Sequence, residues 1–346
     1  MTETERVAVL AHEKFPHRSK TANGVLRYTD AEVVAVLDRD NPGERAADLL
    51  PAVQDAPVVA EFADAQAAAD GEIDTLLIGI APIGGGFDDS WRPDVRAAIE
   101  AGCDVVSGLH YFLAEDSEFS ALAAEHGVEL RDVRRPHDDL TVAEGRADEV
   151  AADVVLTVGT DCSVGKMTTT MELAAAAEAA GIDARVIPTG QTGIVIEGWG
   201  NPVDRVVSDF TAGSVEEMIL EVGDDHDLLI VEGQGSIVHP AYSAVTCGIL
   251  HGAMPDALVL CHAAGREAVH GYEETPLPPI SEYVDLYESL ARPVHETAVV
   301  AGSLNTRSVD DDEAAREAVA AFEREIDAPA TDPIRFDAAE IVEVLQ

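Results

Sequence analysis

Runs of consecutive apolar residues recur along the chain and alternate with longer segments in which apolar residues are spaced as on one face of a helix. The runs at residues 75–81 and 154–158 are typical of strands that are buried on both faces of a sheet. Strands that alternate with helices form βαβ units, whose strands lie parallel to one another. The pattern therefore predicts an α/β protein with parallel sheets.

The predicted elements fall into two sets, which we interpret as two domains. The first set has strands at residues 6–11, 32–38, 58–59, 75–81, 104–106 and 128–133, helices at 63–69, 93–101 and 117–126, and an irregular loop at 12–23. The second has strands at 154–158, 184–187, 227–231, 257–261 and 297–301, helices at 214–222, 280–290 and 310–326, and an alanine-rich helix that ends at Gly181. We place the first domain at residues 1–135, a linker at 136–147 and the second domain at 148–346.

The loop after the strand at 154–158 has the clearest chemical pattern. It reads GTDCSVGK from Gly159 to Lys166, and a helix follows it. Such a loop presents backbone N–H groups and the positive end of a helix to a phosphate, and the lysine adds a charge. The usual pattern, G-x-x-x-x-G-K-[ST], is changed twice: five residues separate the glycines, and Met167 replaces the magnesium-binding hydroxyl, with Thr168 one place later. We predict a phosphate cradle here and a P-loop NTPase-like second domain.

Three other strands of the second domain end in polar, glycine-rich segments. These segments are residues 191–193, 232–236 and 262–266. Ligands of open parallel sheets bind at the carboxyl ends of the strands, so we expect the three segments to lie beside the cradle. Glu232 is placed to bind magnesium or orient a water, and the alternative is a strand-end charge that faces solvent.

The first domain has a Rossmann-like order of elements but lacks the glycine pattern of a dinucleotide site. No G-x-G-x-x-G follows its first strand. Asp38, at the end of the second strand, is the only feature that favours binding of NAD.

Charge narrows the possible partners. The 346 residues include 66 acidic and 22 basic ones, a formal net charge of −44, and the acidic residues are spread along the chain. A hydrophobic fraction of 47% is that of a globular protein. Molar salt shortens the range of self-repulsion to a few ångströms, so we interpret the chain as a halophile's cytoplasmic protein. Nucleic acid and anionic membranes would repel it, which leaves small molecules as partners.

Lysine is rare enough to be informative. Only Lys14, Lys20 and Lys166 occur, and the other 19 basic residues are arginine. Lys166 lies in the cradle, while Lys14 and Lys20 share the loop at 12–23 and mark a second candidate site. The alternative for this pair is chance survival near a mobile N-terminus.

The cysteines do not suggest a metal or disulfide framework. Cys103, Cys162, Cys247 and Cys261 form no C-x-x-C pair, which fits reduced thiols. No apolar run approaches the length of a membrane span, and no signal-peptide pattern begins the chain. Cys162, near a helix N-terminus, is either a nucleophile or a small residue that fills the loop.

The second domain resembles dethiobiotin synthetase. The resemblance rests on the loop at 159–166, on Pro188-x-x-x-Thr-Gly and on Val231-Glu-Gly-Gln-Gly-Ser-Ile-Val-His-Pro. It implies ATP and magnesium as cofactors, with Asp161 and Glu232 as metal ligands, and Met167 departs from the family at the third ligand.

Most of the chain is similar to a two-domain P-loop family, formerly of unknown function, that includes D-glutamate N-acetyltransferase. The similar segments are 105–110, 159–162, 165–169, 189–193, 231–236, 239–242, 250–252 and 255–262, together with Arg266. The resemblance implies acetyl transfer from acetyl-CoA to the amine of D-glutamate or a related D-amino acid. The cradle would then hold the phosphates of coenzyme A without hydrolysis, which accounts for Met167.

Acetyl transfer requires a base for the attacking ammonium and donors for the developing oxyanion. The candidate catalytic residues are His239, as the first choice of base, Glu232 and Asp209, with His262 as a further base. The candidate cofactor-binding residues are Gly159, Thr160, Asp161, Cys162, Ser163, Gly165, Lys166, Met167, Thr168 and Asn305. The candidate substrate-binding residues are Gln191, Thr192, Gln234, Arg266, Lys14, Lys20 and His110.

Three functions stay open at this point. They are an acetyl-CoA-dependent N-acyltransferase, an ATP-dependent ligase or kinase of the dethiobiotin synthetase type, and a nucleotide-binding regulator without chemistry. We also expect a homo-oligomer, as in many P-loop proteins.

Overall fold

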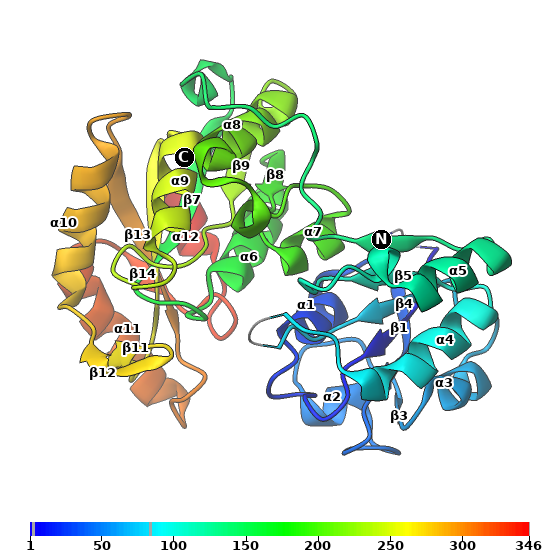
Figure 1. The fold of residues 1–346 in the computed structure, drawn as a ribbon. Helices are drawn as coiled ribbons and strands as arrows, with labels where there is room; N and C mark the ends of the chain where they lie inside the picture. Colours follow the sequence, from blue (N-terminus) through cyan, green and yellow to red (C-terminus); the bar gives the residue numbers. More distant parts are fainter. Residues whose placement is uncertain (2–3, 83–84, 346) are drawn as a thin grey trace. The chain divides into compact units, whose positions relative to one another are not determined.

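Two compact units make up the chain (Figure 1). The computed structural model describes residues 1, 4–82 and 85–345. The first unit contains residues 1–136 together with 191–202, and the second contains 137–190 and 203–346. The segment 191–202 therefore belongs to the first unit, although it lies far along the chain from the rest of it.

A six-stranded parallel sheet forms the centre of the first unit, in the order β3-β2-β1-β4-β5-β6. Its strands are β1 (Arg6–Leu10), β2 (Glu32–Leu37), β3 (Val58–Val59), β4 (Thr75–Ile78), β5 (Asp104–Ser107) and β6 (Leu130–Asp132). Its helices are α1 (Lys20–Tyr28), α2 (Ala46–Leu49), α3 (Phe62–Ala68), α4 (Arg92–Glu100), α5 (Ser117–His126) and α7 (Gln191–Glu197). The strand order reverses between β1 and β4, which is the ligand-binding edge in Rossmann-like sheets.

A second six-stranded parallel sheet, in the order β14-β13-β10-β7-β9-β8, forms the centre of the other unit. Its strands are β7 (Asp153–Gly159), β8 (Ala184–Ile187), β9 (Leu228–Val231), β10 (Ala257–Ala263), β13 (Ala298–Asn305) and β14 (Ala330–Thr331). The helices are α6 (Lys166–Ala179), α8 (Thr211–Val222), α9 (Ser243–Ala253), α10 (Ile280–Ala291), α11 (Asp312–Ile326) and α12 (Ala339–Val344). A short hairpin, β11 (Ala268–Val269) with β12 (Tyr272–Pro276), follows β10.

Apolar strand residues form the cores of both units. Val7 to Leu10 of β1 and Leu228 to Val231 of β9 are almost completely buried. Burial on both faces explains why these strands read as unbroken apolar runs in the sequence. Part of the second core lies between the sheet, α6 and α12, where Leu173 and Ile341 are fully buried. The α/β prediction with two parallel sheets is confirmed.

Helix ends follow local sequence signals. Asp116 caps α5, and its carboxylate accepts hydrogen bonds from the N–H groups of Glu118 and Phe119. Gly127 ends the same helix with φ of 70°. Such signals explain why the predicted helix at 117–126 matches α5.

Among the helices not predicted from the sequence are α1, α7 and α9, whose sequences contain glycine or begin in segments that were expected to be loops. Helix α1 begins at Lys20, inside the loop predicted at 12–23, and α7 begins at Gln191, where a loop segment was expected. Helix α9 contains Gly248 and Gly252, and a Cβ on Gly252 would lie 2.3 Å from the carbonyl oxygen of Ala212. Glycine lowers helix propensity, but here it lets α9 approach α8 closely, so packing outweighs propensity.

Candidate active site

The predicted cradle connects β7 to α6. Ser163 and Gly165 take positive φ angles of 56° and 121°, which turn the chain into the helix. The Lys166 side chain is 7% exposed, and its Nζ donates a hydrogen bond to the carbonyl oxygen of Asp161 at 2.9 Å. The hydroxyl of Tyr287, from α10, donates to the carbonyl oxygen of Gly159 at 2.7 Å. The loop is thus held from inside and from the neighbouring helix.

Asp161 joins the cradle to the segment after β10. Its Oδ1 accepts from the N–H of Cys162 at 2.7 Å. Its Oδ2 accepts from the Arg266 guanidinium at 3.1 Å and from the N–H of His270 at 2.8 Å. The carboxylate is buried, so the arginine and the backbone donors replace its lost hydration.

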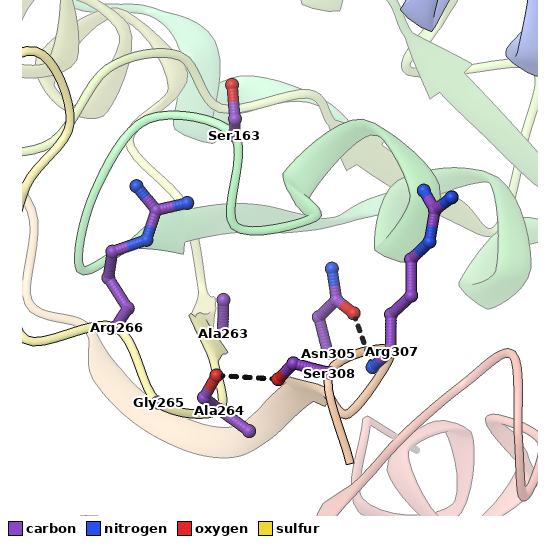
Figure 2. Close-up of a pocket in the computed structure, with 8 residues that line it drawn as sticks. All are labelled: Ser163, Ala263, Ala264, Gly265, Arg266, Asn305, Arg307 and Ser308. Carbon is purple, nitrogen blue, oxygen red and sulfur yellow. Dashed lines mark hydrogen bonds between the residues drawn. The ribbon is translucent and has the colours of Figure 1, made fainter. Parts of the chain in front are cut away.

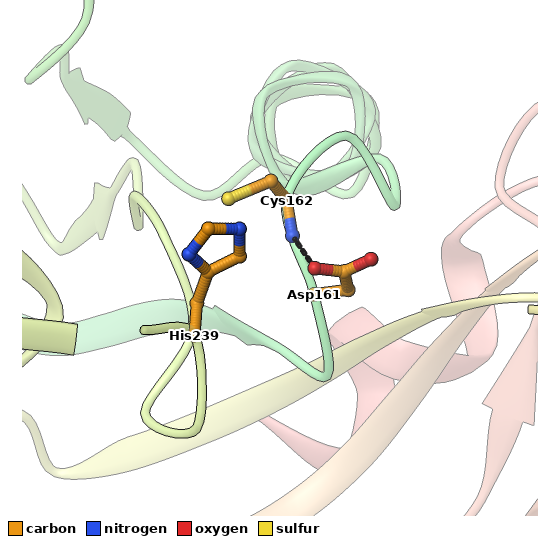
Figure 3. Close-up of side chains that lie close together, drawn as sticks. All are labelled: Asp161, Cys162 and His239. Atoms are coloured by element: carbon orange, nitrogen blue, oxygen red, sulfur yellow. Dashed lines mark hydrogen bonds between the residues drawn. The ribbon is translucent and has the colours of Figure 1, made fainter. Parts of the chain in front are cut away.

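His239 is a buried neighbour of the cradle whose two ring nitrogens both contact backbone. Its Nδ1 accepts from the N–H of Ala241 at 3.2 Å, so the proton of the neutral ring lies on Nε2, which donates to the carbonyl oxygen of His270 at 3.1 Å. Figure 3 shows the ring next to the Cys162 thiol, and one ligand-type atom from each of Asp161, Cys162 and His239 lies within 4.8 Å of the others. The His239 ring thus ties the hairpin after β10 to the cradle.

The arrangement is a poor match for a magnesium ion at Asp161. Magnesium prefers oxygen ligands in near-ideal octahedral geometry, whereas the nearby group contains a thiol and an imidazole. Arg266 already supplies positive charge to the Asp161 carboxylate. Glu232, the other predicted metal ligand, is not a member of this group among the described residues.

Glu232 instead contacts the end of the segment that follows β8. It is 3% exposed, and its Oε2 accepts from the N–H of Gly190 at 3.2 Å. The amide of Gln234 donates to Thr189, at 2.5 Å to the carbonyl oxygen and 3.1 Å to the hydroxyl. Gly233 packs so closely that a Cβ there would lie 1.7 Å from the carbonyl oxygen of Thr157. The segment 232–234 and residues 189–190 therefore form one tightly bonded group.

His262 lies at the end of β10 with its Nδ1 2.7 Å from the hydroxyl of Thr160. Burial and the nearby charge of Arg266 lower the pKa of His262 to about 4, although Asp161 acts in the opposite direction. The ring also stacks on Phe322 of α11, with 5.8 Å between centroids. His262 is therefore neutral at pH 7 and supports the cradle residue beside it.

A cavity of about 420 Å³ opens beside the cradle. Figure 2 shows Arg266 and Arg307 on opposite sides of it, with Asn305 between them and Ser163 above. The residues that line it are Ser163, Ala263, Ala264, Gly265, Arg266, Asn305, Arg307 and Ser308. The Ser308 hydroxyl donates to the Ala264 carbonyl at 3.0 Å, and the N–H of Arg307 donates to Asn305 Oδ1 at 3.0 Å.

Three predicted residues, Ser163, Arg266 and Asn305, meet at this cavity. Sequence reasoning missed Arg307 and Ser308, although both lie just after the strand-end residue Asn305 and are separated from it by Thr306. Two arginines on one cavity are notable in a chain with so few basic residues, and they make the cavity suitable for an anion.

The other predicted residues are distributed over both units. In the second unit, Met167 is 4% exposed, Thr168 is half-buried in the first turn of α6, and Asp209 is exposed in the short 3₁₀ segment Ser208–Phe210. Lys14, Lys20, His110, Gln191 and Thr192 all belong to the first unit. The roles of these residues stay predictions.

Comparison with known proteins identifies the family. A domain of unknown function, DUF1611, described as a P-loop domain, matches residues 141–342, and its Rossmann-like N-terminal partner matches residues 39–136. The chain belongs to the DUF1611 family. A crystal structure of a DUF1611 family protein from Anabaena variabilis is 38% identical, with a TM-score of 0.93 over 99% of both chains.

Two curated relatives of this DUF1611 protein are named D-glutamate N-acetyltransferase. The relative from Tritonibacter scottomollicae is 39% identical over 276 residues, which are 78% of this chain and 80% of the relative. The relative from a Pseudoalteromonas species is 38% identical over 269 residues, with the same shares covered. The chain is an enzyme of the N-acetyltransferase class, which removes the non-catalytic regulator from consideration. No helix among the described residues has the length and apolar character needed to cross a membrane.

Proposed function

We propose that this protein transfers the acetyl group of acetyl-CoA to the amine of D-glutamate, and that the cradle and its cavity hold the phosphate-bearing end of coenzyme A. The names of the two relatives support the reaction. The single structural observation that supports acetyl-CoA as the acetyl donor is the cavity between Arg266 and Arg307, which adjoins the cradle at Ser163.

Coenzyme A suits this region chemically. Its pyrophosphate needs N–H donors and a positive charge, which the start of α6 and Lys166 provide. Its further phosphate would lie near Arg266 or Arg307, whose planar guanidinium groups can each bind two phosphate oxygens. Asn305 offers an amide to the adenine edge.

The reaction needs no phosphoryl transfer. The acceptor ammonium loses a proton to a base, and the free amine attacks the thioester carbonyl carbon. The new C–N bond forms, the C–S bond breaks, and the coenzyme A thiolate leaves and takes up the amine's second proton. The protein therefore needs to hold phosphates without cleaving them, and Met167 in place of the magnesium-binding hydroxyl fits that requirement.

A direct test measures free thiol in molar KCl. The enzyme is incubated with acetyl-CoA and D-glutamate, with L-glutamate, no acceptor, and added ATP and magnesium as parallel reactions. Thiol release that requires D-glutamate and does not depend on ATP is the expected result. Formation of ADP or phosphate without thiol release would instead favour the ligase.

A further inference from the structure

The length of coenzyme A separates its phosphates from its reactive thioester. With covalent bonds like those of a peptide, the arm between them spans on the order of 15 Å when extended. His239 lies beside Cys162 of the cradle. If the cradle holds the phosphates, the acceptor amine must be bound some distance from this group, at a second site.

The first unit has a ligand-binding edge at the point where its strand order reverses. His12 is separated from the end of β1 by Ala11 alone, and Gly79 directly follows β4, the neighbouring strand. The N–H of Ala22, in the first turn of α1, donates to the carbonyl oxygen of Gly79 at 2.8 Å. The start of α1 therefore lies over the carboxyl ends of β1 and β4, where ligands of such sheets bind.

Helix α7 completes this edge from a distant part of the sequence. The hydroxyl of Thr192 lies 2.9 Å from that of Thr21 in α1, and both residues are buried. The side chain of Gln191 packs on Gly108 after β5, where a Cβ would lie 3.0 Å from its Cγ. The start of α7 thus brings a half-buried amide to the carboxyl end of β5.

The loop between β1 and α1 concentrates positive charge. In residues 12–20 the sequence HEKFPHRSK has two lysines, one arginine and two histidines, against one acidic residue. Side chains hold the loop in place: Asn23 donates to the carbonyl oxygen of Pro16 at 2.7 Å, and Asn41 donates to that of Phe15 at 3.1 Å. A structured basic loop in a chain of net charge −44 is suited to an anionic ligand.

Contacts within the loop argue against a dinucleotide as that ligand. Asp38, at the end of β2, would have to accept hydrogen bonds from a ribose. Its Oδ1 already accepts from the N–H of Glu13, and its Oδ2 from the amide of Asn41, both at 2.6 Å. His12 and Phe15 also occupy the loop where a dinucleotide site has glycines, and both are buried.

His12 provides an independent sign of a ligand. Its Nε2 lies 3.1 Å from Asp94 Oδ2, and the ring is completely buried. Burial alone would raise the pKa of Asp94, but hydrogen bonds from His12 and the N–H of Phe62 lower it. Among the described residues, no hydrogen-bond partner reaches His12 Nδ1. A buried lone pair without a partner is uncommon, and an N–H of a ligand would satisfy it.

We propose that the acceptor, an α-amino acid with two carboxylates, binds to the first unit at the carboxyl ends of β1 and β5. Lys14 and Lys20 attract its carboxylates, and His12 Nδ1 accepts an N–H of its ammonium group. The acidic groups that contact this loop are Asp38, which accepts from the N–H of Glu13, and Asp94, which contacts His12, while Glu13 itself pairs with Arg39. This assignment rests on the proposed acetyl transfer for the identity of the ligand.

Steady-state kinetics of the full-length enzyme test the assignment. The variants are Lys14→Gln with Lys20→Gln, Arg307→Gln in the cavity of the second unit, and Arg45→Gln as control. Arg45 is in the first unit, where it pairs with Asp55 on the surface. At one KCl concentration, the double lysine variant should raise KM for D-glutamate about tenfold and leave KM for acetyl-CoA within about twofold. Arg307→Gln should raise KM for acetyl-CoA about tenfold and leave KM for D-glutamate within about twofold.

Two results would overturn the assignment. One is a KM for D-glutamate that changes no more in the lysine variant than in Arg45→Gln, and the other is a rise in KM for acetyl-CoA instead. If the wild-type enzyme transfers no acetyl group, the proposed function fails. Binding of D-glutamate, measured by calorimetry with coenzyme A present, then tests the proposed site by itself. D-glutamate binding that the lysine variant loses supports it, whereas no binding, or binding of NAD, contradicts it.

Discussion

The Arg266 guanidinium lies 3.1 Å from the Asp161 carboxylate and joins the cradle to the loop after β10. The Asp161 side chain is almost fully buried, whereas that of Arg266 is 26% exposed. The pair fixes one wall of the cavity, because Arg266 also lines it. The same contact therefore shapes both the cradle and the cavity beside it.

We expect Arg266→Ala to weaken both stability and donor binding. Removal of the guanidinium leaves a buried carboxylate with backbone donors alone, at a cost of about 1–3 kcal/mol of unfolding free energy. Denaturant unfolding gives the stability, and KM for acetyl-CoA gives the binding. Adding Asp161→Asn should restore part of the stability but none of the binding. If Asp161→Asn does not relieve the loss, the buried charge is not its cause.

We expect the buried His262 ring to make the free energy of unfolding decrease as the solution is acidified. The folded pKa of about 4 lies below the ordinary value of 6.5, because burial disfavours the charged ring. The unfolded chain therefore binds a proton first, and stability is lost as pH falls from 6.5 towards 4. A His262→Gln variant should lose less stability than the wild type over this interval when urea unfolding is measured at each pH. Equal slopes would show that His262 does not contribute.

Gly252→Ala should destabilise the contact between α8 and α9. Its new Cβ would lie 2.3 Å from the Ala212 carbonyl oxygen, so the helices must separate at a cost of about 1–3 kcal/mol. Gly86→Ala is the control, since among the described residues no atom beyond its chain neighbours lies within 4 Å of a Cβ there. Thermal unfolding of both variants provides the comparison, and equal midpoints would contradict the close packing.

Salt should stabilise the folded protein strongly. A net charge of −44 repels itself, and the Debye length shortens to about 3 Å at 1 M salt. Raising KCl from 0.1 M to molar concentrations should increase the unfolding temperature by about 10 °C or more. Sucrose, which is excluded from protein surfaces but does not screen charge, serves as control. Equal effects of sucrose and KCl would argue against charge screening.

The sequence was sufficient for those parts of the fold and site that local signals determine. Apolar runs located β1 and β7, and the helix predicted at 117–126 matches α5, which has capping residues at both ends. Ligands of parallel sheets bind at the carboxyl ends of the strands, and Ser163, Arg266 and Asn305, chosen as candidates near such ends, line one cavity. These residues lie at or after the carboxyl ends of strands of one parallel sheet, so their convergence is a property of the topology.

Other features depend on packing that no local pattern records. Thr192 pairs with Thr21 because α7 joins the first unit, and nothing in the segment TGQTG indicates that destination. The contacts of Asp161 with Arg266 and His270 depend on the hairpin after β10, whose short strands were not predicted. Arg307 was missed because a single exposed arginine carries no pattern of its own.

The membership of α7 in the first unit has a consequence for synthesis of the chain on the ribosome. The chain passes between the units after residues 136, 190 and 202. Thr192, the partner of Thr21, and Gln191, which packs on Gly108, are therefore translated long after the rest of the sheet of the first unit. The nascent first unit cannot complete its packing until residues 191–202 have emerged, by which time β7, the cradle and β8 have already left the exit tunnel. A fragment that stops at the linker would lack these contacts permanently.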